Sequence, residues 1–386
     1  MNKLLRIVSY ILVAAVASCV TLAMCQNTPK TEPSDWSKLD ELKQLVEEKF
    51  IDETDDVTLL DGAAAGLVDS LPDRWSYYIP ASSYAAHEEQ MNNSYVGIGI
   101  TIVVRDDGLL DVTQVNPDSP ALQAGMMPGD VLSEVEGVSV AELGLEGTKN
   151  AIRGKAGTSV NITVIREEEP LSMTVTRQTI NTVVASGEML EGNVGLVKIV
   201  NFDSRCASES IAAIEQLLEQ GATSLIFDVR FNPGGYKHEL VQLLDYLLPE
   251  GTLFCSEDYT GVTYIDESDP EYLDMPMAVL VNGESYSAAE FFAAALDEYD
   301  AAVVVGEPTT GKGYFQNTFQ LSDGSAVGLS VGKYFTPKGV SLEGVGITPE
   351  ISVTVDAETA TRIYSGLLAP EEDSQMQAAV KALISQ

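Results

Sequence analysis

Positively charged residues are scarce in this sequence of 386 residues. It contains 22 lysines and arginines against 58 aspartates and glutamates, so its formal net charge is -36 at pH 7. A surface of that sign repels phosphate backbones and anionic lipid headgroups. We therefore expect no nucleic-acid partner.

Residues that hold metals are also few. The only histidines are His87 and His238, and the four cysteines form no C-x-x-C pair. Structural zinc sites need more soft ligands than this. We therefore predict no metal and no other cofactor. A disulfide between Cys206 and Cys255 stays open, but free buried thiols are the interpretation we favour.

One long apolar run stands near the N-terminus. Lys3 and Arg6 precede a nearly unbroken hydrophobic stretch, residues 7–24, so residues 1–25 read as a signal anchor or signal peptide. We favour an uncleaved anchor and an extracytoplasmic, membrane-tethered protein; cleavage and secretion are the alternative. Cys19 follows small residues, as in lipoproteins that are lipidated on cysteine.

The rest of the chain divides by composition and by hydrophobic period. A polar stretch with two prolines follows the apolar run, and apolar residues at helical spacing resume near Leu39. The predicted segments are a tether (26–35), an N-terminal helical domain (36–92), a β-rich module (93–180), an α/β core (181–370) and a C-terminal helix (371–386).

The β-rich module is marked by a hydrophobic period of two. Strands are expected at 97–104, 109–115 and 131–140, with a short helix after Asn116-Pro117 that Gly125 closes. This order, with the Ser119-Pro120-Ala121 and Pro128-Gly129-Asp130 motifs, resembles a PDZ domain of the kind found in bacterial exported proteases.

Strands and helices alternate after Thr182, which predicts an α/β layer. Ligands and catalytic groups gather beside the carboxyl ends of parallel strands in such layers. The expected strands are 194–200, 225–229, 277–281 and 302–305, and the expected helices are 208–219, 236–247 and 287–296.

Three loops follow these strands. The first carries Gly234-Gly235, whose amides could stabilise an oxyanion, although an ordinary turn explains the glycines as well. The second carries Ser287, which could simply cap a helix. The third carries Lys312, but a phosphate-binding loop is disfavoured because Gly313 stands where a hydroxyl residue is needed. A desolvated Lys312 beside Ser287 could accept the serine proton.

Together the three loops resemble those of the carboxyl-terminal processing peptidases, or tail-specific proteases: R-x-N-x-G-G, S-x-S-A-x-E and G-x-x-T-x-G-K-G-x-x-Q. The Tyr334–Gly339 and Gly344–Glu350 segments look like the closing part of that family. The resemblance implies an α+β multidomain protein with a crotonase- or ClpP-like layered core. It implies Ser287 as nucleophile, Lys312 as general base, Gln316 as the residue that orients the lysine, and oxyanion amides from Ala288 and from Gly234 or Gly235.

Other assignments remain open around this site. Ser285 is the alternative nucleophile, and a Ser-His-Asp triad through His238 and Asp228 is a less favoured one. We expect Arg230 to fix loop shape through charge-assisted bonds. Tyr286, where the family has a small residue, and Phe231 depart from the family pattern, so the preference at the cut site is in doubt. His87 is expected in a solvated helix.

The PDZ resemblance implies a peptide-binding site. The amides of Ile98, Gly99 and Ile100 would bind a terminal carboxylate while the substrate tail adds to the sheet edge, opposite a helix over 145–153. Partners would be proteins with accessible C-terminal tails, and the oligomeric state stays open. The rival functions are a catalytically inactive PDZ surface adaptor and an acyl-transfer enzyme for small ligands.

Overall fold

The computed structural model describes residues 36–105 and 107–384, so the predicted anchor, the lipidation site at Cys19 and the whole predicted tether lie outside the described residues. Within the described ranges no helix is both long and apolar enough to cross a bilayer. Contacts divide the chain into two units, Met1–Leu67 and Val68–Gln386.

The first unit is helical where it is described. It holds α2 (Ser37–Lys49) and most of α3 (Asp56–Asp69). No residue of α2 is buried, and Leu39, Leu42 and Leu45 are exposed. The helical spacing seen in the sequence is thus present here as an exposed apolar stripe.

A six-stranded sheet forms the centre of the second unit. Its order is β10-β11-β12-β15-β16-β19, and only the β10–β11 pair is antiparallel. The predicted strands are confirmed to within one residue: β11 ends one residue earlier than expected, β12 begins and ends one residue earlier, and β16 ends one residue later. The bounds are β10 (Ala185–Leu190), β11 (Val194–Ile199), β12 (Ser224–Asp228), β15 (Met277–Val281), β16 (Ala302–Gly306) and β19 (Ile351–Ser352).

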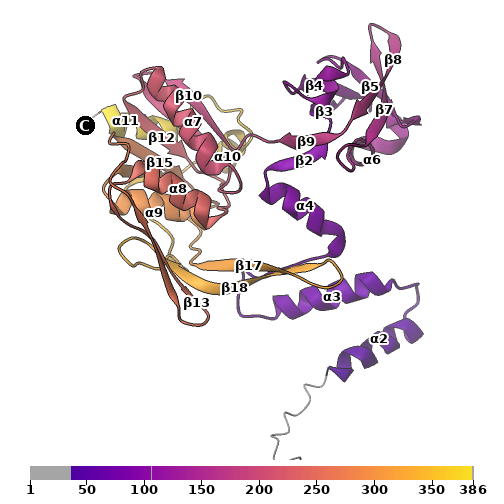
Figure 1. Cartoon of the computed structure of the whole chain (residues 1–386), viewed down its shortest axis with the longest axis horizontal. Coiled ribbons are helices and arrows are strands. Elements are labelled where there is room, and N and C mark those ends of the chain that lie inside the picture. The colour runs from indigo at the N-terminus through magenta and orange to yellow at the C-terminus, as the bar shows by residue number, and fades with distance from the viewer. Residues whose placement is uncertain (1–35, 106, 385–386) are drawn as a thin grey trace, which may run out of the picture. The chain divides into compact units, whose positions relative to one another are not determined.

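Helices cover both faces of this sheet (Figure 1). Successive residues of one strand face opposite layers: Phe227 packs with the cluster of α7, α8 and α9, whereas Ile226 packs with α11. Parallel strands buried on both faces are near-continuous hydrophobic runs, which is why the sequence revealed them. The helices are α7 (Cys206–Glu219), α8 (Lys237–Leu247), α9 (Ala288–Glu298) and α11 (Ser374–Ile384), with α10 (Ala357–Tyr364) between the last two.

Three predicted helix starts were displaced. Helix α7 begins two residues earlier than expected, at Cys206, while α8 and α9 begin one residue later. Tyr236 and Ser287 are therefore the residues that precede the first helical turn, outside it. For Ser287 this position decides where the side chain can point.

A second sheet was not predicted. Its order is β1-β18-β13-β14, and β17 also pairs with β18. These strands were missed because many of their residues are half-buried or exposed, so no apolar run marks them. The bounds are β1 (Tyr77–Ile79), β13 (Gly251–Asp258), β14 (Thr263–Ser268), β17 (Tyr314–Gln320) and β18 (Ala326–Phe335), and α4 (Ala81–Met91) follows β1.

The PDZ-like module is inserted through a two-stranded ribbon, β2 (Ser94–Gly97) with β9 (Gln178–Asn181). Its own sheet has the order β3-β4-β5-β7-β8, so β3 is an edge strand, and it encloses a separate hydrophobic core. The elements are β3 (Ile100–Val104), β4 (Leu110–Val115), α5 (Pro120–Gln123), β5 (Val131–Val135), β6 (Val138–Ser139), α6 (Val140–Ile152), β7 (Ser159–Arg166) and β8 (Glu169–Thr176).

One expectation for this module was wrong. The strand expected over 131–140 is broken, because Glu136 and Gly137 take positive φ values of 52° and 76° and turn the chain between β5 and β6. The helix expected over 145–153 is present as the part of α6 after Gly144, whose φ of 65° separates it from a preceding turn that begins at Val140.

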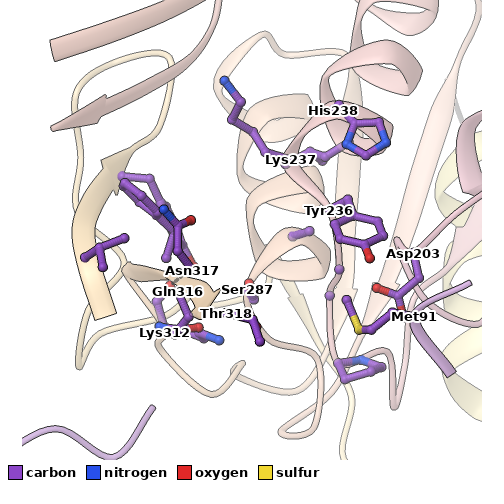
Figure 2. A pocket seen from close by; sticks show the side chains of 18 of the residues that line it. Met91, Asp203, Tyr236, Lys237, His238, Ser287, Lys312, Gln316, Asn317 and Thr318 are labelled. Carbon is purple, nitrogen blue, oxygen red and sulfur yellow. Dashed lines mark hydrogen bonds between the residues drawn. The ribbon is translucent and has the colours of Figure 1, made fainter. Parts of the chain in front are cut away.

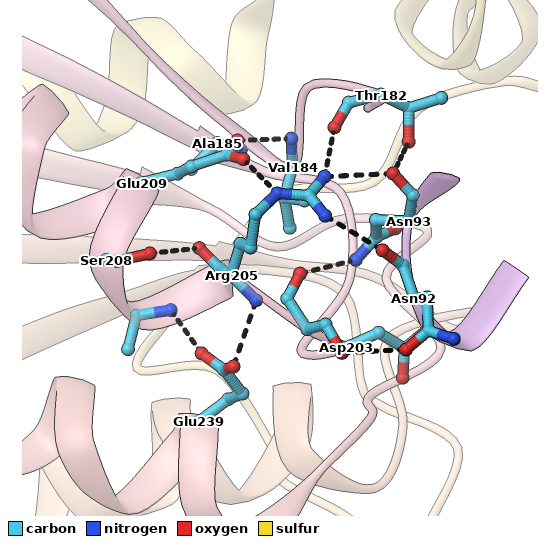
Figure 3. A network of polar contacts seen from close by, with 12 residues as sticks. Asn92, Asn93, Thr182, Val184, Ala185, Asp203, Arg205, Ser208, Glu209 and Glu239 are labelled. Atoms are coloured by element: carbon cyan, nitrogen blue, oxygen red, sulfur yellow. Dashed lines mark hydrogen bonds and ion pairs between the residues drawn. The ribbon is translucent and has the colours of Figure 1, made fainter. Parts of the chain in front are cut away.

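Arg205 joins the linkers of the module to the core (Figure 3). Its guanidinium donates to the carbonyls of Asn92 at 2.8 Å, Asn93 at 2.9 Å and Thr182 at 2.8 Å. It also pairs with Glu209 at 2.9 Å. One side chain therefore holds the segment before β2 and the segment after β9.

Candidate active site

Ser287 sits between strand β15 and helix α9 in a strained conformation. Its φ is 58° and its ψ is -123°, values that residues with a side chain rarely adopt. Ala288 and the rest of the first turn of α9 are buried, whereas Ser287 lines a cleft. A strained serine facing a cleft suits chemistry better than helix capping alone.

Gly234 packs against this serine, and Gly235 packs against the backbone of Phe202. A Cβ atom on Gly234 would lie 2.7 Å from Ser287 Cβ, and one on Gly235 would lie 2.2 Å from the carbonyl carbon of Phe202, so neither position tolerates a side chain. The Gly234 amide donates to Asn232 Oδ1 at 2.9 Å. Within the described chain the amides of Gly235 and Ala288 donate to no protein group, which favours Gly235 over Gly234 as an oxyanion donor.

Glu290 connects the serine turn to the lysine loop. Its Oε2 accepts from the amides of Ser287 at 3.1 Å and Lys312 at 2.9 Å. Its Oε1 accepts from the Gly311 amide at 2.6 Å and the Thr309 hydroxyl at 2.5 Å. Burial raises the pKa of this carboxyl although these four donors favour its ionised form. The sequence showed the glutamate only as part of a motif.

Lys312 extends into a half-buried aromatic environment. Its Nζ lies 4.9 Å from the ring centre of Trp75 and 5.9 Å from that of Tyr286. Burial lowers the pKa of Lys312 to about 8, against the opposing influence of the carboxylates of Asp73, Glu343 and Glu290. Within the described residues this amine forms no ion pair. Trp75 was not predicted, because 237 residues separate it from the lysine.

Tyr334 is a further residue that sequence reasoning missed. Its hydroxyl donates to the carbonyl of Lys312, and it also interacts with the Ser287 hydroxyl. Burial raises the pKa of this phenol far above its usual value, so it remains neutral. The segment that carries it was noted in the sequence, but no role was assigned to the tyrosine.

Gln316 is not placed as expected. Its Nε2 donates to Ser330 Oγ at 2.9 Å and to the Tyr314 carbonyl at 3.1 Å. Among the described residues it has no hydrogen bond to Lys312. A bulge between Phe315 and Gln316 in the pairing of β17 with β18 shifts the register at this point.

The alternative catalytic groups are engaged elsewhere. Ser285 is fully buried and donates to the Val229 carbonyl at 2.7 Å, so it has no access to a substrate. The less favoured Ser-His-Asp alternative is not assembled, because Asp228 pairs with Arg230 at 2.7 Å, while His238 is exposed and stacks on Tyr236. Arg230 also pairs with Asp373 at 2.8 Å, consistent with a role in fixing loop shape.

One cleft of about 990 Å³ is lined by Ser287, Lys312, Gln316, Tyr334 and the glycine pair. In Figure 2, Lys312 and Gln316 lie on one side of Ser287, and Tyr236 and Asp203 lie on the other. His87, expected to be solvated, is half-buried and also lines the cleft. Cys206 and Cys255 are free thiols, Cys206 buried and Cys255 half-buried. No group of metal-binding side chains occurs among the described residues.

The predicted carboxylate loop of the PDZ module is a tight turn. Gly99 has a φ of 79°, and its carbonyl accepts from the Asn116 amide at 2.9 Å. The carbonyl of Ile98, which is buried, accepts from the Ala121 amide at 3.0 Å. Ile100 begins β3, whose free edge is open to another strand.

Comparisons with known proteins agree across most of the chain. Residues 193–353 match the model of peptidase family S41, residues 112–166 match the PDZ domain, and residues 13–83 match the N-terminal domain of the activating protease CtpB.

Two relatives match most of this chain. The chain is similar to the carboxy-terminal processing protease CtpA of Bacillus subtilis (strain 168), with 32% identity over 91% of this chain and 78% of the relative. It is 30% identical to a probable CtpA-like serine protease of Staphylococcus epidermidis (strain ATCC 12228 / FDA PCI 1200), over 91% of this chain and 73% of the relative. Among solved structures, the photosystem II D1 C-terminal processing protease aligns with a TM-score of 0.47 and 25% identity, over 84% of this chain and 90% of that one.

Proposed function

The chain belongs to the carboxy-terminal processing proteases of peptidase family S41 and is a serine-type peptidase with a PDZ domain; from this premise we propose that Ser287 and Lys312 form its catalytic dyad. The substrates would be proteins with accessible C-terminal tails, cut at internal peptide bonds. The supporting observation is that a strained serine and a half-buried lysine with a pKa lowered to about 8 line the same cleft.

The dyad accounts for every proton in the reaction. Neutral Lys312 takes the hydroxyl proton as Ser287 Oγ attacks the substrate carbonyl carbon, and the resulting ammonium gives a proton to the leaving amine. An acyl-enzyme on Ser287 remains. Water then attacks it while Lys312 accepts a water proton, and return of that proton to Oγ frees the new carboxyl end.

The developing oxyanion needs donors that are already in place. The amides of Gly235 and Ala288 are the candidates, because the Gly234 amide is occupied by Asn232. Ala288 opens helix α9, so the positive end of the helix dipole adds to the stabilisation.

The arrangement described here is a resting one under this proposal. Ser287 interacts with Tyr334, and Lys312 Nζ lies over aromatic rings, without a hydrogen bond between the two catalytic groups among the described contacts. Gln316 must leave Ser330 to reach the lysine. A tail bound along β3, with its carboxylate at Ile98, Gly99 and Ile100, would shift the population toward an aligned dyad.

The proposed place of action is outside the cytoplasm. Residues 1–25 would hold the enzyme in the membrane as an uncleaved anchor, with lipidation of Cys19 as the alternative. Fractionation of cells expressing the full chain, compared with a Cys19→Ser variant, separates these forms.

The decisive test uses the chain without its first 35 residues and unfolded casein as substrate. Ser287→Ala and Lys312→Ala are expected to lower kcat/KM by at least about 10³-fold, because each removes a group that takes part in bond formation or proton transfer. Lys338→Ala, outside the cleft, is the matched control and should keep the activity of the parent chain. Equal cleavage by all four proteins would end the dyad assignment.

A further inference from the structure

Asp203 is a buried carboxylate, one oxygen of which has no hydrogen-bond partner among the residues that the structure describes. It lies in the loop between β11 and α7, and only 5% of its surface is exposed. Within the described part of the chain its Oδ1 has no hydrogen-bond partner. The residue lines the same cleft as Ser287. Burying a carboxylate of this kind destabilises the folded chain unless a cation or a hydrogen-bond donor pairs with it.

The arginine two residues further along the chain does not pair with Asp203. Arg205, two residues along, spends its guanidinium on Glu209 and on the linker carbonyls. Glu239 adds a second carboxylate nearby, and it is fixed there by the amides of Arg205 at 2.9 Å and Ala207 at 2.8 Å. Burial, followed by the charge of Glu239, raises the pKa of Asp203 to about 7. A positive group would therefore relieve an unfavourable concentration of negative charge.

The surroundings suit a long side chain with a charged end. Met91 and Tyr236 lie beside Asp203 in Figure 2, and the Ser204 amide donates to the Met91 carbonyl at 3.2 Å. Tyr286, one residue before the nucleophile, is close enough for the charge of Asp203 to raise the pKa of its phenol, after burial. An aliphatic stem can pack on such rings while its cation reaches a carboxylate.

The backbone of Asp203 packs beside the glycine pair at the serine. A Cβ atom on Gly235 would lie 2.5 Å from the Asp203 amide nitrogen, and Gly234 packs against Ser287 Cβ. Because Asp203 and Ser287 also line the same cleft, we expect a polypeptide held at Ser287 to pass within side-chain reach of Asp203.

We propose that Asp203 forms a subsite that binds the lysine or arginine side chain of a polypeptide lying in the cleft, and so selects substrates with a basic residue near the cut. The net charge of -36 would draw such substrates toward the enzyme. This inference rests on the proposed function, since it assumes that Ser287 is the reacting group.

The test compares Asp203→Asn with the parent chain on two matched peptide libraries. One library carries a single lysine at each position around the cut, and the other carries norleucine there. The parent should prefer lysine at one position, and Asp203→Asn should reduce kcat/KM for that peptide by about 10- to 100-fold while leaving norleucine peptides within about 3-fold. Asp274→Asn removes an exposed charge outside the cleft and should leave the preference unchanged.

Several outcomes overturn the proposal. Equal losses on both libraries would mean that Asp203 is structural or contacts the peptide backbone, and an unchanged lysine preference would place the subsite elsewhere. Asp203→Asn should also melt no lower than the parent chain, because it removes an unpaired buried charge. Full activity of Ser287→Ala would sink the proposed function instead. Binding of the lysine peptide to Ser287→Ala, with weaker binding to Ser287→Ala/Asp203→Asn, tests the subsite without turnover.

Discussion

Lys312 illustrates how the surroundings of a side chain can lower its pKa, as the proposed role of a general base requires. The rings of Trp75 and Tyr286 lie within 6 Å of its Nζ, and burial outweighs three carboxylates that would otherwise keep the amine charged. The pKa of about 8 leaves a usable neutral fraction near neutrality. At the residue scale, activity is therefore expected to follow the titration of this amine.

The pH dependence has a definite sign. Below the pKa of about 8, Lys312 is protonated and cannot accept the serine proton, so kcat/KM should fall roughly tenfold per pH unit between about pH 8 and pH 6. Trp75→Leu should let water reach the ammonium, raise the lysine pKa and move this limb up by about one unit. A profile measured with an uncharged peptide that stays flat over this range would contradict the assignment.

A carboxylate side chain anchors each end of helix α9, but only the N-terminal end lies at the candidate active site. Glu290 in its first turn joins the Ser287 and Lys312 backbones, whereas Glu298 in its last turn accepts from Thr336 Oγ1 at 2.6 Å and the Lys338 amide at 2.7 Å. Comparing variants of the two residues therefore separates an effect on the alignment of the site from an effect on the stability of the helix.

Glu290→Gln should lose both stability and activity. The amide NH₂ of glutamine would face backbone donors, which costs roughly 2–4 kcal/mol of unfolding free energy, and kcat/KM should drop by at least about 100-fold. The acid limb of the residual activity should move to lower pH, because the charge of Glu290 raises the Lys312 pKa. Glu298→Gln should lose stability in denaturant titration yet keep kcat/KM within about 3-fold. Parallel losses in both variants would make Glu290 merely structural.

The contrast between predicted and missed elements has a physical cause. Strands such as Met277–Val281 are buried on both faces and appear as apolar runs, so they could be predicted. The residues of β14 are mostly exposed, and most of β17 is exposed or half-buried, so their sheet depends on pairing that no local pattern shows.

The candidate site was predictable to a similar degree. Ser287 and Lys312 stand in local motifs, whereas Trp75 and Tyr334 reach the candidate site through contacts between distant segments. The bonds of Gln316 could not be foreseen either, since they depend on a bulge in β17. The sequence thus indicated the candidate reacting side chains, but not what surrounds them.

At the scale of the whole molecule, the chain combines a peptidase core with an inserted PDZ module, as predicted and as the family comparisons show. Each has its own hydrophobic core. The two linkers meet at Arg205 of the core. The loop that carries Arg205 also carries Asp203, and it follows Phe202, which pairs with Gly235. This junction is a route through which tail binding could influence the proposed dyad.

Added tail peptides should therefore raise casein turnover, as the proposed regulation requires. Gly99→Val should abolish that response, because a Cβ there would lie 2.5 Å from Ser119 Cβ at a φ of 79°. Gly137→Ala is the matched control: it adds a side chain at a φ of 76° in open space and should keep the response. Turnover that ignores tail peptides in the parent chain would argue against this regulation.

The ribbon of β2 and β9 gives the module two neighbouring covalent attachments to the rest of the chain. A single nick by another protease in either strand would leave the module joined through the other strand and through four ribbon pairs. Shedding of the module would need two cuts, so a partly damaged enzyme should keep its recognition unit physically attached.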